Sequence, residues 1–141
     1  MFLKRSFSVL LEKQSRNPET VHKPVAPYVH QIEVTGPNKW LTLSGQLGME
    51  IDGMVPEDPL EQLQLALDNI RRNLVAANMN VEDLTKMVFY LVGDFNADKR
   101  RKIIGDFLGE HLPCTTMIYV VALAAPVFKV EVDAWACKEI I

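Results

Sequence analysis

Cysteine and histidine are scarce in this chain, and neither is spaced for metal or redox chemistry. The 141 residues include two cysteines and three histidines. The cysteines form no CxxC motif, and the histidines are too scattered to hold one metal ion. Both cysteines have apolar neighbours, which indicates a reduced, cytoplasmic protein without bound metal. The residues concerned are Cys114, Cys137, His22, His30 and His111.

A surplus of positive charge is also absent. The chain has 15 Lys and Arg against 18 Asp and Glu, which gives a formal net charge of −3. Proteins that bind RNA or DNA usually present a basic surface interleaved with aromatic side chains, and the sequence has no such stretch. The composition therefore argues against nucleic acid as a partner.

No apolar run is long enough to cross a membrane. The longest uncharged run, residues 117–128, is shorter than the roughly 20 residues that a bilayer requires, and it contains Pro126. Four basic residues and one acidic residue lie among apolar side chains in residues 1–16. We interpret residues 1–23 as an N-terminal extension of one domain that spans residues 24–141. An organelle-targeting presequence is the alternative for the start of the chain.

Apolar periodicity predicts a domain of the α+β class. Alternation and short apolar runs indicate strands, whereas spacings of three and four indicate helices. The predicted strands cover 30–35, 40–44, 86–92, 115–123 and 128–137, and the predicted helices cover 59–77 and 96–111.

Local signals support the first helix and one hairpin. Asp58 is a suitable N-cap, Pro59 suits the first helical position, and Glu61 completes a capping box. Asn78 can end the helix in a left-handed conformation. The turn at residues 36–39 predicts that the strands on either side of it pair as a hairpin.

Part of the sheet has no predicted cover. Two helices can cover only one face of a sheet. The other face is also partly apolar, and a second copy of the chain is the simplest cover for it. This predicts a homo-oligomer. The residues assigned to that face are Trp40, Met117, Tyr119, Val121 and Trp135.

Four short motifs carry a family resemblance. Leu41–Gln46 has the pattern of a strand that ends in a small polar tip, where a ligand can approach the backbone. The others are Pro27-Tyr28, Pro113–Thr116 and Val130–Ala134. In this order and at this spacing they resemble the RidA family (YjgF, or L-PSP endoribonuclease-like) over residues 24–137.

The resemblance implies a fold, an assembly and a reaction. The fold is a chorismate-mutase-like mixed sheet with two helices on one face, and the assembly is a homotrimer with ligand pockets between subunits. The reaction is hydrolytic deamination of a small imine or enamine to a keto compound and ammonia. No cofactor is implied, because an imine is already electrophilic. The ribonuclease activity in the family's name is disfavoured by the acidic net charge of this chain.

The resemblance also assigns roles to individual residues. Glu131 matches the glutamate that handles the attacking water, although a solvated strand carboxylate is the alternative. Tyr28 matches a tyrosine that closes the pocket, or it is a surface aromatic. Ser44 and Gly45 match the pocket wall, and Thr116 matches a serine of the family.

Thr115 departs from the family pattern. Active deaminases of the family carry an arginine there that grips the substrate carboxylate. Losing two charge-assisted hydrogen bonds of ~1.5–3 kcal/mol each would weaken binding of a small acid by ~10²–10⁴-fold. We therefore expect an altered substrate preference.

Two nearby residues are candidates for supplementing the pocket. Arg101, in the basic run 99–102, could replace the missing cation, or it belongs to a solvated helix face. Cys114 adjoins the pocket motif, or it is simply a small buried apolar residue. The sequence thus predicts a RidA-like hydrolase of a small metabolite that uses Glu131. The alternative is a non-catalytic trimer that binds a metabolite or regulates a partner.

Overall fold

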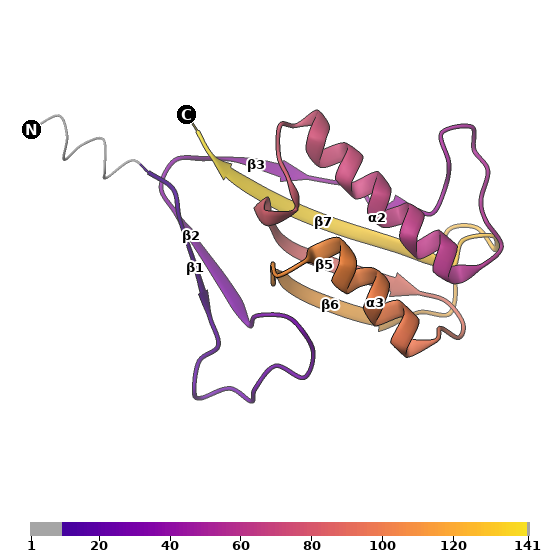
Figure 1. Ribbon diagram of the computed structural model, residues 1–141, viewed down its shortest axis with the longest axis horizontal. Helices are drawn as coiled ribbons and strands as arrows, with labels where there is room; N and C mark the ends of the chain where they lie inside the picture. Colours follow the sequence, from indigo (N-terminus) through magenta and orange to yellow (C-terminus); the bar gives the residue numbers. More distant parts are fainter. Residues whose placement is uncertain (1–9, 141) are drawn as a thin grey trace, which may run out of the picture.

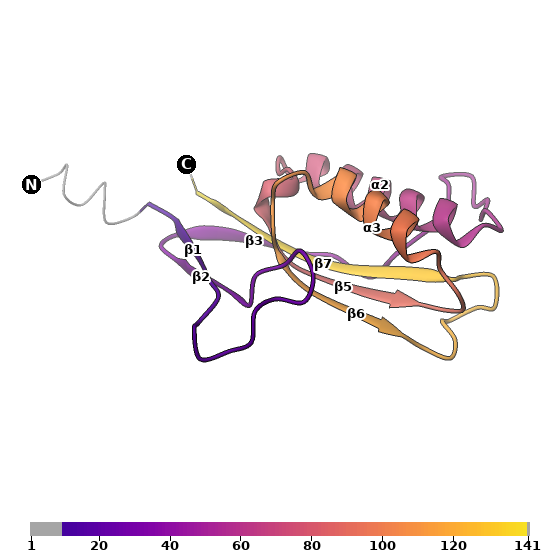
Figure 2. The same ribbon diagram turned by 60° about the horizontal axis from the view of Figure 1, so that its bottom comes forward.

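A mixed sheet carries both helices on one of its two faces (Figure 1; Figure 2). The computed structural model describes residues 10–140. The main sheet has the strand order β3-β7-β5-β6, and β4 also pairs with β7. β5 and β6 are parallel, and the other pairs in this sheet are antiparallel. This arrangement confirms the predicted α+β class. The elements are β1 Glu12–Arg16, β2 Gln31–Thr35, β3 Asn38–Thr42, β4 Gln46–Leu47, α2 Pro59–Ala76, the 3₁₀ turn η1 Val81–Asp83, β5 Leu84–Leu91, α3 Ala97–Leu108, β6 Cys114–Tyr119 and β7 Val130–Glu139.

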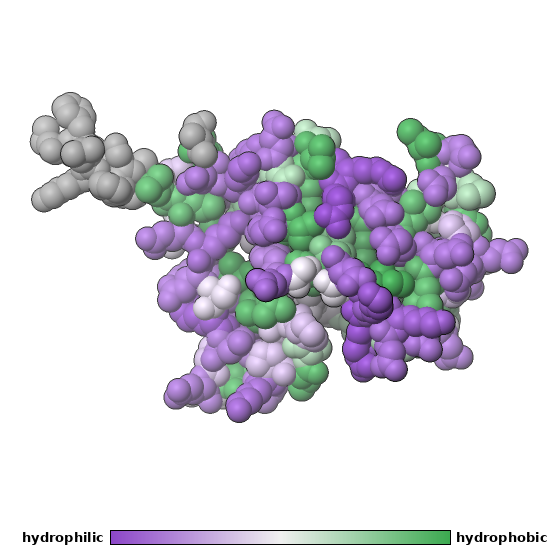
Figure 3. Space-filling model, in the orientation of Figure 1, coloured by the Kyte–Doolittle hydropathy of each residue, from purple (hydrophilic) through white to green (hydrophobic). Residues whose placement is uncertain are grey.

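The core lies between the sheet and the helices. β5 and β7 are the interior strands of the sheet, and alternate side chains on each point beneath the helices. α2 meets them with an apolar stripe at helical spacing. The fully buried residues of this layer include Leu63, Leu67, Ile70, Leu74, Met87, Leu91, Val130, Val132 and Ala134. The outer surface of the helices is mostly polar (Figure 3).

α2 begins where the sequence predicts, but its N-terminal cap differs. Pro59 is the first helical residue, yet the Asp58 side chain makes no capping hydrogen bond, so the predicted capping box is absent. At the other end, Asn78 adopts the expected left-handed conformation with φ of 57°. The proline and the left-handed asparagine therefore set the bounds of the helix.

Two lysines from the sheet bind the carbonyls at the end of α2. Lys39 Nζ donates to the Ala77 oxygen and Lys138 Nζ to the Asn78 oxygen, both at 2.8 Å. The two residues are direct cross-strand partners on β3 and β7. Positive charge at a helix C-terminus interacts favourably with the helix dipole, and the ammonium groups satisfy carbonyls that have no helical partner.

Replacing both Lys39 and Lys138 by methionine should lower the free energy of unfolding by about 1–2 kcal/mol. Urea denaturation would measure the change, and the difference should shrink in high salt. The exposed loop residue Lys23 provides a control, K23M, which should leave the unfolding midpoint unchanged. Equal shifts in the control and the double variant would contradict a specific helix-capping role.

α3 is shorter than predicted. Asn96 caps its start, where Asn96 Oδ1 accepts a hydrogen bond from Lys99 N at 3.0 Å. The helix ends at Leu108, before the predicted end at residue 111, because Gly109 takes a positive φ of 61°. Such a conformation interrupts the helical hydrogen-bond pattern and suits glycine.

The predicted hairpin across residues 36–39 is wrong. β2 pairs with β1, and β3 pairs instead with β7. Arg16 stabilises the β1–β2 pair by donating across it to Gln31 and Glu33 at 2.8 and 2.7 Å. A nearby strand in the assumed N-terminal extension thus supplied the partner for β2. Residues 1–9, on which the presequence alternative rests, lie outside the described residues.

The face of the sheet that carries no helix, which we call the uncovered face, also differs from the prediction (Figure 2). Trp40 and Trp135 lie on it, but the β5–β6 register places Met117 and Tyr119 opposite Phe89 and Leu91, on the helix side. Trp40 is 61% exposed. Met117 and Tyr119 remain partly exposed because β6 is an edge strand and α3 does not cover it fully. Within residues 10–140, no helix has the length and apolar character needed to span a membrane.

Candidate functional site

Glu131 and Gly45 are in direct contact on the uncovered face. Glu131 lies on β7, opposite Leu47 of β4 and Tyr90 of β5. A Cβ atom added to Gly45 would overlap the Glu131 carboxyl group. Only glycine at position 45 therefore lets the backbone approach this carboxylate so closely. The structure thus brings together the Ser44-Gly45 pair and Glu131, which are 86 residues apart in the sequence.

Tyr90 and Asp133 lie beside Glu131 on the same face. The Tyr90 hydroxyl donates to Asp133 Oδ2 at 3.0 Å. This hydrogen bond, partial burial and the negative charges of Asp133 and Glu131 all raise the pKa of Tyr90 above its usual value of 10.0. The phenol therefore stays protonated at neutral pH and keeps donating to Asp133. The sequence does not indicate Tyr90 as a site residue, because its place beside Glu131 follows from the β5–β7 register.

Helix α2 fixes the segment that contacts Glu131. Asn69 Nδ2 donates to the backbone oxygens of Leu47 and Met49, both at 3.0 Å. Asn73 Nδ2 donates to Gln46 Oε1 at 3.0 Å. These amide side chains tie residues 46–49 to a helix that is itself anchored in the core. The backbone segment beside Glu131 is therefore held in place by α2.

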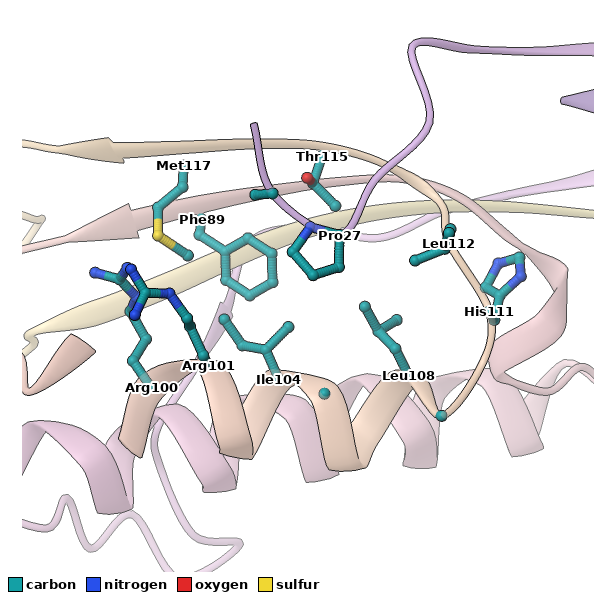
Figure 4. A pocket seen from close by; sticks show the side chains of 13 residues that line it. Pro27, Phe89, Arg100, Arg101, Ile104, Leu108, His111, Leu112, Thr115 and Met117 are labelled. Atoms are coloured by element: carbon teal, nitrogen blue, oxygen red, sulfur yellow. The ribbon is translucent and has the colours of Figure 1, made fainter. Parts of the chain in front are cut away.

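Thr115 lies on the opposite side of the sheet, where it lines a cavity beneath α3. Its cross-strand partner is Met87, which is buried beneath the helices. The cavity, of about 170 Å³, lies between β6, α3 and the loop that carries Pro27. Figure 4 shows Arg100 and Arg101 at one end of it and His111 at the other. The structure thus places Arg101 and Thr115 on the same cavity.

Arg100 is a pocket residue that the sequence did not single out. Its Nη1 donates to the Tyr119 hydroxyl at 2.8 Å, and the residue is half-buried. Arg101 Nη1 forms an ion pair with Asp98 at 3.2 Å, in which the side chains are 65% and 97% exposed. The spacing of Arg100, Ile104 and Leu108 along one helix face was the available signal.

Cys114 and Thr116 face away from this cavity. Lys86 Nζ donates to Thr116 Oγ1 at 2.9 Å on the uncovered face. Cys114 lines a second cavity, of about 410 Å³, between β2 and the sheet. Burial raises the pKa of the Cys114 thiol, although the Lys86 charge and a backbone hydrogen bond at Ile32 act in the other direction. A protonated thiol is a weak nucleophile.

Tyr28 lies in the loop between β1 and β2. Its hydroxyl accepts a hydrogen bond from Val25 N at 3.3 Å. Its ring packs edge-on against His30, with 5.6 Å between the centroids. The preceding residues Ala26 and Pro27 line the cavity beside Thr115, whereas Tyr28 is not among its lining residues.

One protomer does not bring all predicted site residues together. Glu131 is the cross-strand partner of Tyr90 on the uncovered face, whereas Thr115 is the partner of Met87 on the helix face. Side chains on opposite faces of a sheet cannot meet within one copy. A site that contains both Glu131 and the Thr115 cavity therefore requires a second copy of the chain.

Comparison with known proteins identifies relatives over most of the chain. The family model described as Endoribonuclease L-PSP matches residues 19–138. A RutC family protein of Pyrococcus horikoshii is 28% identical over 123 residues, which cover 86% of this chain and 94% of the relative. The Escherichia coli protein named "Putative reactive intermediate deaminase TdcF" is 27% identical over 126 residues, covering 85% and 95%.

Solved structures show the same fold. A Rid family protein of unknown function, YyfB from Yersinia pestis, superimposes with a TM-score of 0.76 at 27% identity and covers 89% of this chain and 98% of its own. The crystal structure of E. coli TdcF with bound serine superimposes with a TM-score of 0.64 at 26% identity, covering 82% and 91%.

Proposed function

We propose that this chain, which belongs to the Endoribonuclease L-PSP (RidA/YjgF) family, hydrolyses a small imine or enamine metabolite to a carbonyl compound and ammonia. The deaminase name of its E. coli relative supports the reaction type. The observation that carries the proposal is the contact between Gly45 and the Glu131 carboxyl group. It holds a half-buried carboxylate against the backbone at the small Ser44-Gly45 pair.

Glu131 acts as the base in this reaction. Its carboxylate accepts a proton from a water molecule, and the water oxygen forms a bond with the imine carbon while the imine nitrogen takes up a proton. The protonated Glu131 then returns its proton to the nitrogen of the resulting carbinolamine, the C–N bond breaks to release ammonia, and the hydroxyl group gives up its proton to solvent as the carbonyl group forms. The Tyr90 hydroxyl keeps Asp133 hydrogen-bonded and so fixes the second carboxylate near Glu131.

The proposed active unit is a homotrimer with the pocket between subunits. Two observations support an assembly of copies. The uncovered face exposes apolar side chains that include Trp40 and Ile118. Glu131 and Thr115 also lie on opposite faces of one protomer, so only a neighbouring copy can complete a site that uses both. Because Thr115 replaces the family arginine, we propose that the substrate preference differs from that of the standard deaminases.

The decisive assay measures ammonia and keto-acid release from freshly generated 2-iminopropionate. Wild type should accelerate release, and E131Q should lower the rate by about 10²–10⁴-fold. T115R should increase activity towards this acid if the hydrolytic groups are intact and only the preference has changed. Equal rates in wild type, E131Q and buffer, over several imines, would overturn the enzymatic proposal. Saturable metabolite binding without turnover would then identify a binding protein.

A further inference from the structure

The cavity beside Thr115 combines apolar walls with two guanidinium groups. Phe89 and Met117 form its sheet side, and Ile104 and Leu108 form its α3 side (Figure 4). Arg100 and Arg101 lie at one end. A mostly apolar pocket with a few converging polar groups is the usual form of a small-molecule site. The arrangement separates a place for an anionic group from a place for an apolar one.

We propose that Arg100 and Arg101 bind the carboxylate of a small acid whose apolar part fills this cavity. The helix thereby supplies the positive charge that residue 115 lacks. The proposal rests on the proposed function, because it names the class of substrate or product that the same protein handles. It moves the carboxylate site from strand β6 to helix α3, and so gives the pocket a different shape.

Arg100 is already held in position for this role. Its hydrogen bond to the Tyr119 hydroxyl uses one of the five N–H donors of the guanidinium, and Tyr119 is in turn packed against Phe95, with 6.3 Å between ring centroids. An arginine fixed in this way loses little conformational entropy when it binds an anion. Among residues 10–140, the other guanidinium N–H groups of Arg100 have no hydrogen-bond partner and can bind a carboxylate.

Arg101 can exchange its present partner for a ligand. Its ion pair with Asp98 joins two exposed side chains three positions apart on α3, and exposed pairs of this kind contribute little. Strongly hydrophilic side chains gather over the start of α3 (Figure 3), where residues 99–102 are all basic. The local charge therefore favours an incoming anion.

The cavity limits the size and polarity of the ligand. A volume of about 170 Å³ is below the roughly 300–1,000 Å³ of pockets for drug-sized ligands, so the cavity suits a small acid. At the far end of the cavity, His111 Nε2 already donates to the Leu84 oxygen at 2.7 Å, so this nitrogen is not available to a ligand. The apolar walls disfavour a second ionised group.

Calorimetric titration with 2-oxobutanoate and its uncharged amide tests this assignment. Wild type should bind the acid at least ten-fold more tightly than the amide. R101M and the double variant R100M/R101M should bind the acid about 10–100-fold more weakly than wild type. K102M removes a charge of the same basic run, but Lys102 does not line the cavity and pairs with Asp106, so it should weaken binding of the acid by less than about three-fold.

Several results would overturn the assignment. No detectable binding of the acid to wild type would do so, as would equal affinity for acid and amide. A loss in K102M as large as in R101M would show a general charge effect instead. Arg101 is 65% exposed, so R101M leaves the core intact and remains informative if the double variant fails to fold.

The same variants separate this inference from the proposed reaction. E131Q should lose ammonia release and still bind 2-oxobutanoate at least as tightly as wild type, because it removes a negative charge and leaves Arg100 and Arg101 in place. Turnover that depends on Glu131, together with binding that ignores Arg100 and Arg101, would overturn only the inference. Binding that depends on the arginines without any turnover would overturn only the proposed hydrolysis.

Discussion

Replacing Gly45 by alanine should lower the rate of imine hydrolysis by about 10²–10³-fold while the protein stays folded. The added methyl group would occupy the position of the Glu131 carboxyl group, so the carboxylate must rotate away from the wall. A displacement of about 1 Å at a reacting group is enough for a rate loss of this size. Steady-state ammonia release would measure the effect, and circular dichroism would confirm folding.

Two controls make this prediction specific. G53A introduces a methyl group at another glycine, where φ is 91° and no atom lies within 4 Å. It should lower stability slightly through backbone strain and leave the rate unchanged. In an E131Q background, G45A should have little further effect, because the group it displaces no longer works as a base. Fully additive losses would show that Gly45 acts independently of Glu131.

Replacing Gln62 by leucine should lower the free energy of unfolding by about 3–6 kcal/mol. The Gln62 side chain is 1% exposed. Its Nε2 donates to the Pro56 and Val127 oxygens at 2.7 and 3.0 Å, and its Oε1 accepts from Lys129 N at 2.8 Å. Leucine would leave three backbone groups of two loops without this partner, and each such loss costs about 1–3 kcal/mol.

Urea denaturation of Q62L and Q64L provides the measurement and its matched control. Gln64 is on the same helix, two residues further along, but it is exposed and bonds only Asp68 among the described residues, at 3.2 Å. Q64L should therefore change the free energy of unfolding by less than about 0.5 kcal/mol. Similar losses in both variants would mean that the buried hydrogen bonds of Gln62 contribute little to stability.

The helices and the central strands could be predicted because their signals are local. The start of α2 at Pro59 and the left-handed Asn78 after it follow from neighbouring residues alone. The burial of alternate residues on β7 likewise follows from a two-residue period. The family resemblance also depends on short motifs, and the match over residues 19–138 confirms it.

Strand pairing could not be predicted in the same way. The hairpin across residues 36–39 was the shortest connection, yet β1 pairs with β2 while β7 pairs with β3. Register then determined which residues share a face. It placed Tyr90 beside Glu131 and put Thr115 and Met117 on the helix side, and the alternation along β6 then put Cys114 and Thr116 on the other face.

The sequence by itself determined the α+β class, the family, the bounds of α2 and which side chains each of the four motifs contains. These depend on periodicity and on residues adjacent in the chain. Only the tertiary structure showed that Gly45 contacts Glu131 and that Arg100 and Arg101 share a cavity with Thr115. Contacts of this kind depend on strand order, register and the position of α3 over the sheet. These are set by packing between distant segments, which no local pattern records.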